Sequence, residues 1–209
     1  MKSPLKDHEL GTIENGNTSI WQQWVTYSFA IDKSFPLQFL LPHIHGLGML
    51  DASIRLWETK NLENPSAPKN ASESSIMECS YWYFLSHQWV LGAYEVVRTL
   101  AEKGKKKKRQ KANEERIFGK ETYRKIVETR DLLAEARIPL AKLRPKANGQ
   151  TAIPFPVIFP GDGFGWRITI DESRPGKEIS RRELADAVLE LLKFIYDNES
   201  VVEKSIVME

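Results

Sequence analysis

Cysteine is almost missing from this chain of 209 residues. Cys79 is the only one, so no disulfide can form within the chain. The N-terminal residues also lack the apolar run of a signal peptide, and no stretch has the length and hydrophobicity of a membrane span. These absences predict a cytoplasmic protein that has no membrane partner.

The chain also lacks a clear excess of positive or negative charge. The sequence has 30 Lys and Arg against 28 Asp and Glu, a formal net charge of +2. This balance by itself favours neither a nucleic acid nor an anionic membrane as the partner, so the distribution of the charges matters more than their sum.

Metal-binding residues are also scarce, because the chain has only four histidines. His43 and His45 are two residues apart, and on a helix such neighbours point in nearly opposite directions. Asp51 or Glu58 would have to complete a site with them, and ordinary packing or surface roles explain both histidines better. We therefore predict no metal site and no cofactor, and we interpret Cys79 as a small core residue rather than a nucleophile.

The longest uninterrupted helical pattern runs from Glu73 to Lys103. It contains no proline, and its apolar residues recur with a period of 3.6, from Ile76 through Trp89 to Ala101. Gly104 is suited to end the helix. We expect this helix to be the centre of a mainly α-helical bundle, with its two apolar stripes covered on most sides.

Four further helices are predicted around it. The first begins near Thr18, and the last is capped at Ser180, with Glu183 in the capping-box position. The other two cover 36–59, with a kink or break at 43–48 because of Pro42, Gly46 and Gly48, and 114–136, which Pro139 then bends or ends. Residues 1–17 have no periodicity and are interpreted as a flexible arm, which leaves 18–209 as a single domain.

Near the C-terminus the period changes to two. Ile153, Phe155, Val157 and Phe159 alternate with prolines, and a Gly-Asp-Gly turn at 161–163 leads to a second alternating run. This pattern predicts a small β-hairpin over about 152–171, with the proline-rich strand at the sheet edge.

Two segments resemble a known group of proteins. The run LSHQWVLGAYEVVRTL at 85–100 and the run SRRELADAVLELL at 180–192 are similar to bacterial helical-bundle proteins of the HEPN class. This resemblance implies a helical fold, association with RNA and, as in many HEPN proteins, a homodimer.

The catalytic signature of that class, an arginine followed four to six residues later by a histidine, is missing. Arg137 is the natural counterpart of the arginine, but Lys142, Leu143 and Arg144 occupy the places where the histidine would fall. Cleavage of RNA without a metal needs an acid or base to move the proton of the 2′-hydroxyl. The resemblance therefore implies a fold and RNA binding without catalysis.

If the chain is nevertheless an enzyme, its weak catalytic candidates are Glu95, Arg98, Arg137 and His87. Glu95 and Arg98 are three residues apart on the long helix, and we expect them to pair with Arg137 near the junction with the next helix. The same three residues are also expected in a purely structural ion-pair network, which is the interpretation that we prefer.

The most biased stretch follows the long helix. Six basic residues lie between positions 105 and 111 and are suited to contact a phosphate backbone without sequence specificity: Lys105, Lys106, Lys107, Lys108, Arg109 and Lys111. A solvated loop is the alternative, since Glu114 and Glu115 follow at once.

Three function classes remain from the sequence. The first is an HEPN-like module that binds RNA or a partner protein without catalysis. The second is a divergent metal-independent endoribonuclease of toxin or defence type, and the third is a structural oligomerisation module. The binding module requires a contiguous basic face. The enzyme requires a polar cleft that holds a group with a shifted pKa, and the oligomerisation module requires an exposed apolar patch.

Overall fold

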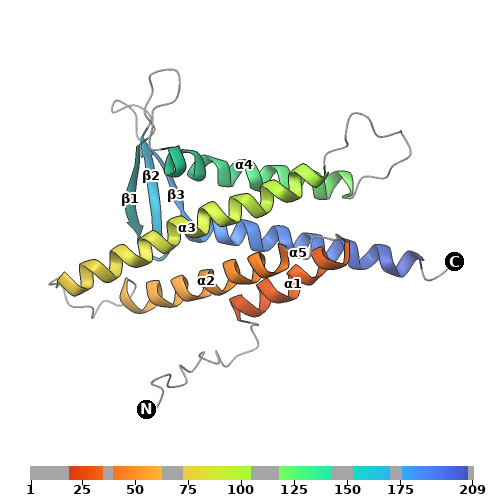
Figure 1. The fold of residues 1–209 in the computed structure, drawn as a ribbon, viewed down its shortest axis with the longest axis horizontal. Helices are drawn as coiled ribbons and strands as arrows, with labels where there is room; N and C mark the ends of the chain where they lie inside the picture. The colour runs from red at the N-terminus through yellow and green to blue at the C-terminus, as the bar shows by residue number, and fades with distance from the viewer. Residues whose placement is uncertain are drawn as a thin grey trace, which may run out of the picture.

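A computed structural model of the chain describes residues 19–34, 40–62, 73–104, 118–142, 153–169 and 176–206. Within these ranges it has five helices and one three-stranded antiparallel sheet (Figure 1). The elements are α1 (Ile20–Ser34), α2 (Leu40–Asn61), α3 (Glu73–Gly104), α4 (Lys120–Lys142), β1 (Ile153–Phe159), β2 (Gly163–Thr169), β3 (Lys177–Ser180) and α5 (Arg181–Ile206). The predicted fold class, a helical bundle with a small C-terminal β element, is confirmed.

The long helix α3 has the predicted position in the bundle. It packs against α2, α4 and α5, and it ends at Gly104 as expected. In its C-terminal half the side chains of Trp89, Val97 and Leu100 are buried. In its N-terminal half the prediction of a covered helix is wrong, because Ile76 is 56% exposed. Among the described residues, Met77 in the same turns is also exposed, at 74%.

Trp89 is the largest side chain that α3 contributes to the core. Its ring meets that of Trp24 from α1 edge to face, with the ring centroids 6.2 Å apart. Its indole N–H donates a 3.0 Å hydrogen bond to the carbonyl oxygen of Leu47 on α2. A single residue thus joins three helices.

The sheet stands at one end of the bundle, beside the N-terminal half of α3 (Figure 1). The hairpin of β1 and β2 has the predicted bounds, and β1 is an edge strand, as its prolines require. Phe164, Trp166 and Ile168 of β2 point into the core. The third strand β3 was not predicted, because it has only four residues and continues directly into α5.

Two boundaries differ from those predicted. The expected break in α2 at 43–48 does not occur, because Pro42 lies in the first turn of the described helix, where the missing N–H donor has little effect. Helix α4 begins at Lys120 instead of near 114, with the carbonyl of Gly119 accepting the amide of Tyr123, and it continues through Pro139 to Lys142 instead of ending there. The predicted arm at 1–17 lies outside the described residues.

The start of α5 agrees with its predicted cap. The Ser180 hydroxyl accepts hydrogen bonds from the backbone amides of Arg182 and Glu183, at 3.1 and 3.4 Å. The apolar side chains of Leu184 and Ile195 on this helix are buried. Among the described helices, none is long and apolar enough to cross a membrane.

We expect Trp89→Ala to lower the free energy of unfolding by about 3 to 5 kcal/mol, because it leaves a cavity where three helices meet. Chemical denaturation followed by far-UV circular dichroism measures the loss. Trp21→Ala is the matched control, since Trp21 is 40% exposed on α1 and its replacement should cost less than about 1 kcal/mol. A similarly small loss for Trp89→Ala would contradict this description of the core.

Candidate functional site

Three of the predicted site residues meet on the surface between α3 and α4. Arg98 pairs with Glu95 at 2.7 Å and with Glu102 at 2.5 Å, and Arg137 approaches Glu95 at 3.6 Å. The guanidinium of Arg137 also lies over the ring of Tyr94, 4.8 Å from its centroid. The expected pairing is therefore present.

This cluster is open to solvent. The side chains of Glu95, Arg98 and Arg137 are 47%, 39% and 31% exposed. Hydrogen bonds to Glu95 and Glu102 raise the pKa of Arg98 above its usual value. Solvent-exposed ion pairs of this kind contribute little to stability. The cluster is a surface network at a helix junction.

The fourth candidate, His87, faces the backbone of Leu140 on α4. Burial lowers the pKa of the imidazole, and the interaction with the Leu140 backbone opposes this effect only in part. Its Nε2 atom is buried without a hydrogen-bond partner. No hydrogen bond or ion pair of the described residues joins His87 to Glu95 or Arg137, so the four candidates do not form one catalytic group.

The basic run at 105–111 lies outside the described residues, and its role in RNA binding stays a prediction. His45 and Cys79 have local roles: the imidazole Nε2 of His45 lies 2.9 Å from the hydroxyl of Ser28, and burial raises the pKa of the Cys79 thiol. Within the described ranges, no three His, Cys, Asp or Glu side chains are grouped in a way that could hold a metal ion.

The structure contains a buried ionic network that the sequence analysis missed. The side chains of Arg181, Asp51 and Glu58 are all 0% exposed. Arg181 donates to Asp51 at 2.6 Å and to Glu58 at 3.2 Å, and its guanidinium carbon lies 5.9 Å from the centre of the Trp89 ring. One arginine at the start of α5 therefore bridges two acids that stand two turns apart on α2.

Further donors complete the hydrogen bonding of these two acids. Asp51 accepts from the indole of Trp24 at 3.1 Å and from Arg55 at 2.9 Å. Burial alone would lower the pKa of Arg55, but Asp51 and Asp186 raise it above its usual value. Glu58 accepts from Arg182 at 3.3 Å and from the backbone amide of Phe164 at 2.8 Å.

Glu58 also determines which residue can stand at the start of β2. Gly163 has φ of 75°, and a Cβ atom there would lie 2.2 Å from the carboxyl carbon of Glu58. Arg182 holds the preceding turn as well, through a 2.6 Å hydrogen bond to the carbonyl oxygen of Gly161. Glu58 of α2 and Arg182 of α5 thus hold the hairpin against the helices.

Before Lys60 in its last turn, α2 has no charged residue outside this network. Between Leu40 and Thr59 the charged residues of α2 are Asp51, Arg55 and Glu58, and all three belong to the network. On α3, Glu78 is the only charged residue between Ile76 and Tyr94, and it accepts a 2.7 Å hydrogen bond from the indole of Trp57.

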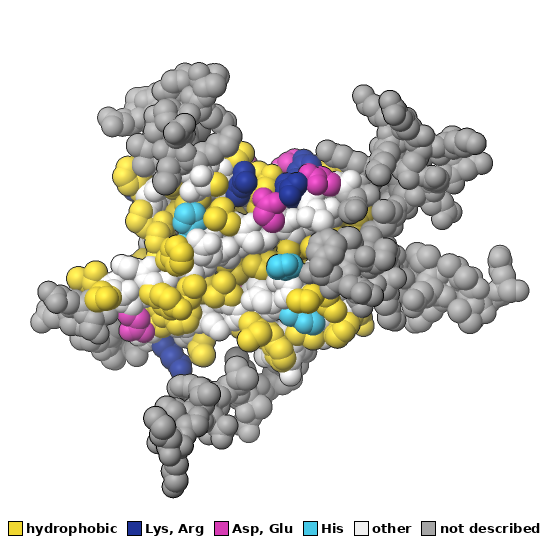
Figure 2. All heavy atoms as spheres, in the orientation of Figure 1, with side chains coloured by type: hydrophobic (Ala, Val, Ile, Leu, Met, Phe, Trp, Pro, Cys, Tyr) yellow, Lys and Arg dark blue, Asp and Glu magenta, His cyan; other side chains and the backbone are white. Residues whose placement is uncertain are grey.

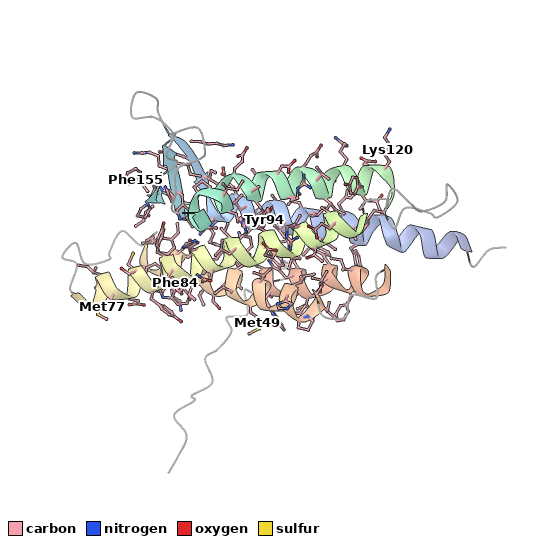
Figure 3. All side chains as sticks on the ribbon, turned by 45° about the horizontal axis from the view of Figure 1, so that its top comes forward. Met49, Met77, Phe84, Tyr94, Lys120 and Phe155 are labelled. Carbon is pink, nitrogen blue, oxygen red and sulfur yellow. The ribbon has the colours of Figure 1, made fainter. Side chains whose placement is uncertain are left out.

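Large apolar side chains occupy the outer side of these two helices. We define the outer α2–α3 face by five of them, each between 52% and 74% exposed: Met49, Leu56, Met77, Tyr81 and Phe84. Hydrophobic side chains gather over the N-terminal half of α3 and the adjoining part of α2, with few charged groups among them (Figure 2). Met77 and Met49 lie at the lower edge of the view, on α3 and α2, and Phe84 lies on the N-terminal half of α3 (Figure 3).

The two helices of this face are held side by side. The rings of Trp57 and Trp82 stack at 5.9 Å, and Trp57 also stacks on Phe164 of the sheet at 5.5 Å. These ring contacts hold α2 against α3 and against the sheet. Exposed aromatic and methionine side chains on a charge-poor surface are typical of protein interfaces.

Comparison with known proteins does not assign the chain to a family. No protein-family model, curated protein or solved structure matches the chain.

Replacing Arg181 tests the buried network. We expect Arg181→Met to lower the free energy of unfolding by about 3 to 5 kcal/mol, because it leaves Asp51 and Glu58 buried with one cation fewer. Arg167→Met is the control: Arg167 pairs with Glu178 on the surface, so its loss should cost less than about 1 kcal/mol. Denaturant titration measures both variants, and equal losses would count against the network.

The lowered pKa of His87 predicts a specific pH dependence. In the unfolded chain the imidazole binds a proton near pH 6.5, whereas in the folded protein it does so only at lower pH. The free energy of unfolding should therefore fall as the pH drops below about 6.5, until the folded-state pKa is reached. Unfolding of wild type and His87→Gln between pH 7.5 and 5.5 measures this effect.

The variant should lose less stability than wild type over that interval. His43→Gln, at an exposed position of α2, is the control and should keep the wild-type slope. Identical slopes for all three proteins would show that the surroundings of His87 do not favour its neutral form.

Proposed function

We propose that the chain is a non-catalytic, HEPN-like interaction module that binds a protein partner through the outer α2–α3 face. The observation that carries this proposal is the exposure of five large apolar side chains, whereas Asp51 and Glu58 of α2 are turned inward. A partner that covers Met77, Tyr81 and Phe84 would remove apolar surface from water, which is the main driving force of protein association.

The geometry of the polar residues supports the non-catalytic part of the proposal. General acid–base catalysis needs a proton donor or acceptor of suitable pKa within reach of the reacting group. Glu95, Arg98 and Arg137 instead neutralise one another on an open surface. The imidazole of His87 is turned toward the backbone of Leu140, burial lowers its pKa, and no hydrogen bond or ion pair of the described residues joins it to these three residues.

Binding of RNA is the second candidate, and it rests on the sequence of the run at 105–111. A contiguous basic face would favour it over a protein partner. In the described part of the chain, however, exposed arginines are paired with acids: Arg98 with Glu95, Arg124 with Glu128, and Arg167 with Glu178. The surface charges of the bundle therefore favour the protein partner.

Site-specific photo-crosslinking in cells that produce the protein naturally tests the proposal. A benzoylphenylalanine in place of Phe84 should give light-dependent protein adducts of the full chain. The same group in place of Arg124, which is 62% exposed on α4, should give none. Met77→Glu should abolish the adducts, because it puts a charge into the apolar contact.

The opposite outcomes are equally clear. Adducts that disappear after ribonuclease treatment would replace the protein partner with RNA. Equal labelling from Phe84 and Arg124, or no adduct from either position, would overturn the proposed interaction face.

A further inference from the structure

We propose that the partner on the outer α2–α3 face is an amphipathic helix of another protein, and that an arginine of this helix pairs with Glu78. This inference rests on the proposed function and names the chemistry of the partner. The charge of Glu78, the aromatic rings beside it and the apolar side chains around it carry the argument.

Glu78 is an exposed carboxylate at the margin of the outer α2–α3 face. Its Oε1 atom accepts a 2.7 Å hydrogen bond from the indole of Trp57, and its Oε2 atom has no hydrogen-bond partner among the described residues. No described cation forms an ion pair with it either, although Lys60 is exposed in the last turn of α2. The carboxylate therefore depends on water for the rest of its hydrogen bonding.

A wholly apolar partner does not fit this surface. It would remove the Glu78 carboxylate from water and leave it with a single hydrogen bond, and burial of an unpaired charge is unfavourable. A partner that supplies a cation replaces the lost water with a charge-assisted hydrogen bond, which is stronger than a bond between neutral groups. Charge complementarity thus requires a basic residue opposite Glu78.

The rings beside Glu78 favour arginine over lysine. Residues three and four positions apart are neighbours on a helix, which sets Tyr81 and Trp82 next to Glu78. Tyr81 is 57% exposed, and its ring meets that of Trp82 edge to face at 5.7 Å. A planar guanidinium can bind a carboxylate through two N–H groups and lie on an aromatic ring as well.

The protein already holds one arginine in this way. Near the other end of α3, Arg137 of α4 approaches Glu95 at 3.6 Å and lies over the ring of Tyr94, 4.8 Å from its centroid. Glu78 and Glu95 each have a tyrosine of α3 beside them, but among the described residues only Glu95 is paired with an arginine. The partner supplies the arginine that is missing at Glu78.

The form of the partner follows from the surface that it covers. In the middle of a helix the backbone N–H and C=O groups bond to one another, so α2 and α3 offer none of the free backbone groups of a sheet edge. A segment that covers this face has to satisfy its own backbone groups, as a helix does. An amphipathic helix that lays its apolar side on a hydrophobic surface is a recurring mode of recognition.

The remaining exposed residues fit such a helix. Ile76, which is 56% exposed, adds apolar surface on the side of α3 away from Glu78, because two residues on a helix are about 200° apart. Ser75, one turn before Glu78, is polar without charge. Lys60, one turn after Leu56, puts a positive charge at the margin of the face and disfavours basic residues there. A helix with one arginine therefore fits better than a polybasic helix.

Selection of displayed peptides on the full chain tests the chemistry of the partner. The library consists of amphipathic helices with leucine on one side and random residues along its borders. We expect wild type to enrich arginine at one border position. Glu78→Lys should enrich aspartate or glutamate at that position instead, because the sign of the charge on the face is reversed.

The affinity of a selected arginine peptide, measured by fluorescence anisotropy, tests the ion pair itself. Glu78→Gln should raise the dissociation constant at least about 10-fold, as expected for the loss of a charged hydrogen bond. The amide oxygen of this variant can still accept from Trp57, so the helical circular dichroism signal should not change. Glu128→Gln is the matched control: Glu128 is 58% exposed on α4, and its replacement should leave the affinity unchanged.

The same two variants connect the peptides with the natural partner. In cells that produce the protein naturally, the adducts from a benzoylphenylalanine in place of Phe84 should become weaker with Glu78→Gln and stay unchanged with Glu128→Gln. Equal adducts with both variants would count against the arginine.

The outcomes separate this inference from the proposed function. Peptides that Met77→Glu releases, but that show no preference for a basic residue and bind Glu78→Gln as tightly as wild type, would overturn the arginine and keep the interaction face. A wild type that sediments as a dimer, separated by Met77→Glu, would put a second copy in place of the helix. Failure to select any peptide that Met77→Glu releases would overturn the helix, and the face as well if position 84 gives no adduct.

Discussion

The pairing of Arg181 with Asp51 and Glu58 is the interaction on which the rest of the structure depends. Removing a guanidinium and two carboxylates from water costs several kcal/mol for each ion, and the cost is offset only if every partner is in place. The Trp24 indole, Arg55, Arg182 and the amide of Phe164 are those partners. Because they come from α1, α2, α5 and the hairpin, the network links these four parts of the structure to one another.

The same network determines what the surface looks like. An amphipathic helix normally keeps its charges outside and its apolar residues inside. In α2 the acids Asp51 and Glu58 are buried, whereas Met49 and Leu56 are exposed on the outer side of the same helix. The ionic core and the apolar face that we propose for binding thus lie on opposite sides of one helix.

In the surface cluster at the α3–α4 junction, charged residues pair without being removed from water. Glu95, Arg98 and Arg137 lie close enough to pair, as spacing on a helix predicts, but water screens them. These exposed ion pairs therefore contribute little to the stability of the fold, in contrast to the buried pairs. His87, two turns before Tyr94, shows the effect of burial on a single group, because the same type of helix contact there excludes water and lowers its pKa.

The sequence by itself determined the features that depend on local chemistry. Periodicity determined α3 and its end at Gly104, alternation determined the hairpin, and Ser180 capped α5 where expected. It missed β3 because four residues carry too weak a period, and it placed α4 six residues early, although Gly119 interrupts the helical pattern. For the candidate residues, it determined which could pair along one helix and which lay in a basic run.

Only the tertiary structure decided which charged residues are buried and which large apolar residues stay exposed. The spacing of Ile44, Leu47, Asp51, Ile54 and Glu58 puts two acids into an apolar stripe, and this was the one available signal of the network. An acid in such a stripe can stay buried only when a cation reaches it, and the cation comes from Arg181, more than 120 residues away. Burial is a property of elements that meet in space, and so the exposure of Met77 and Phe84 also became known only when the bundle was assembled.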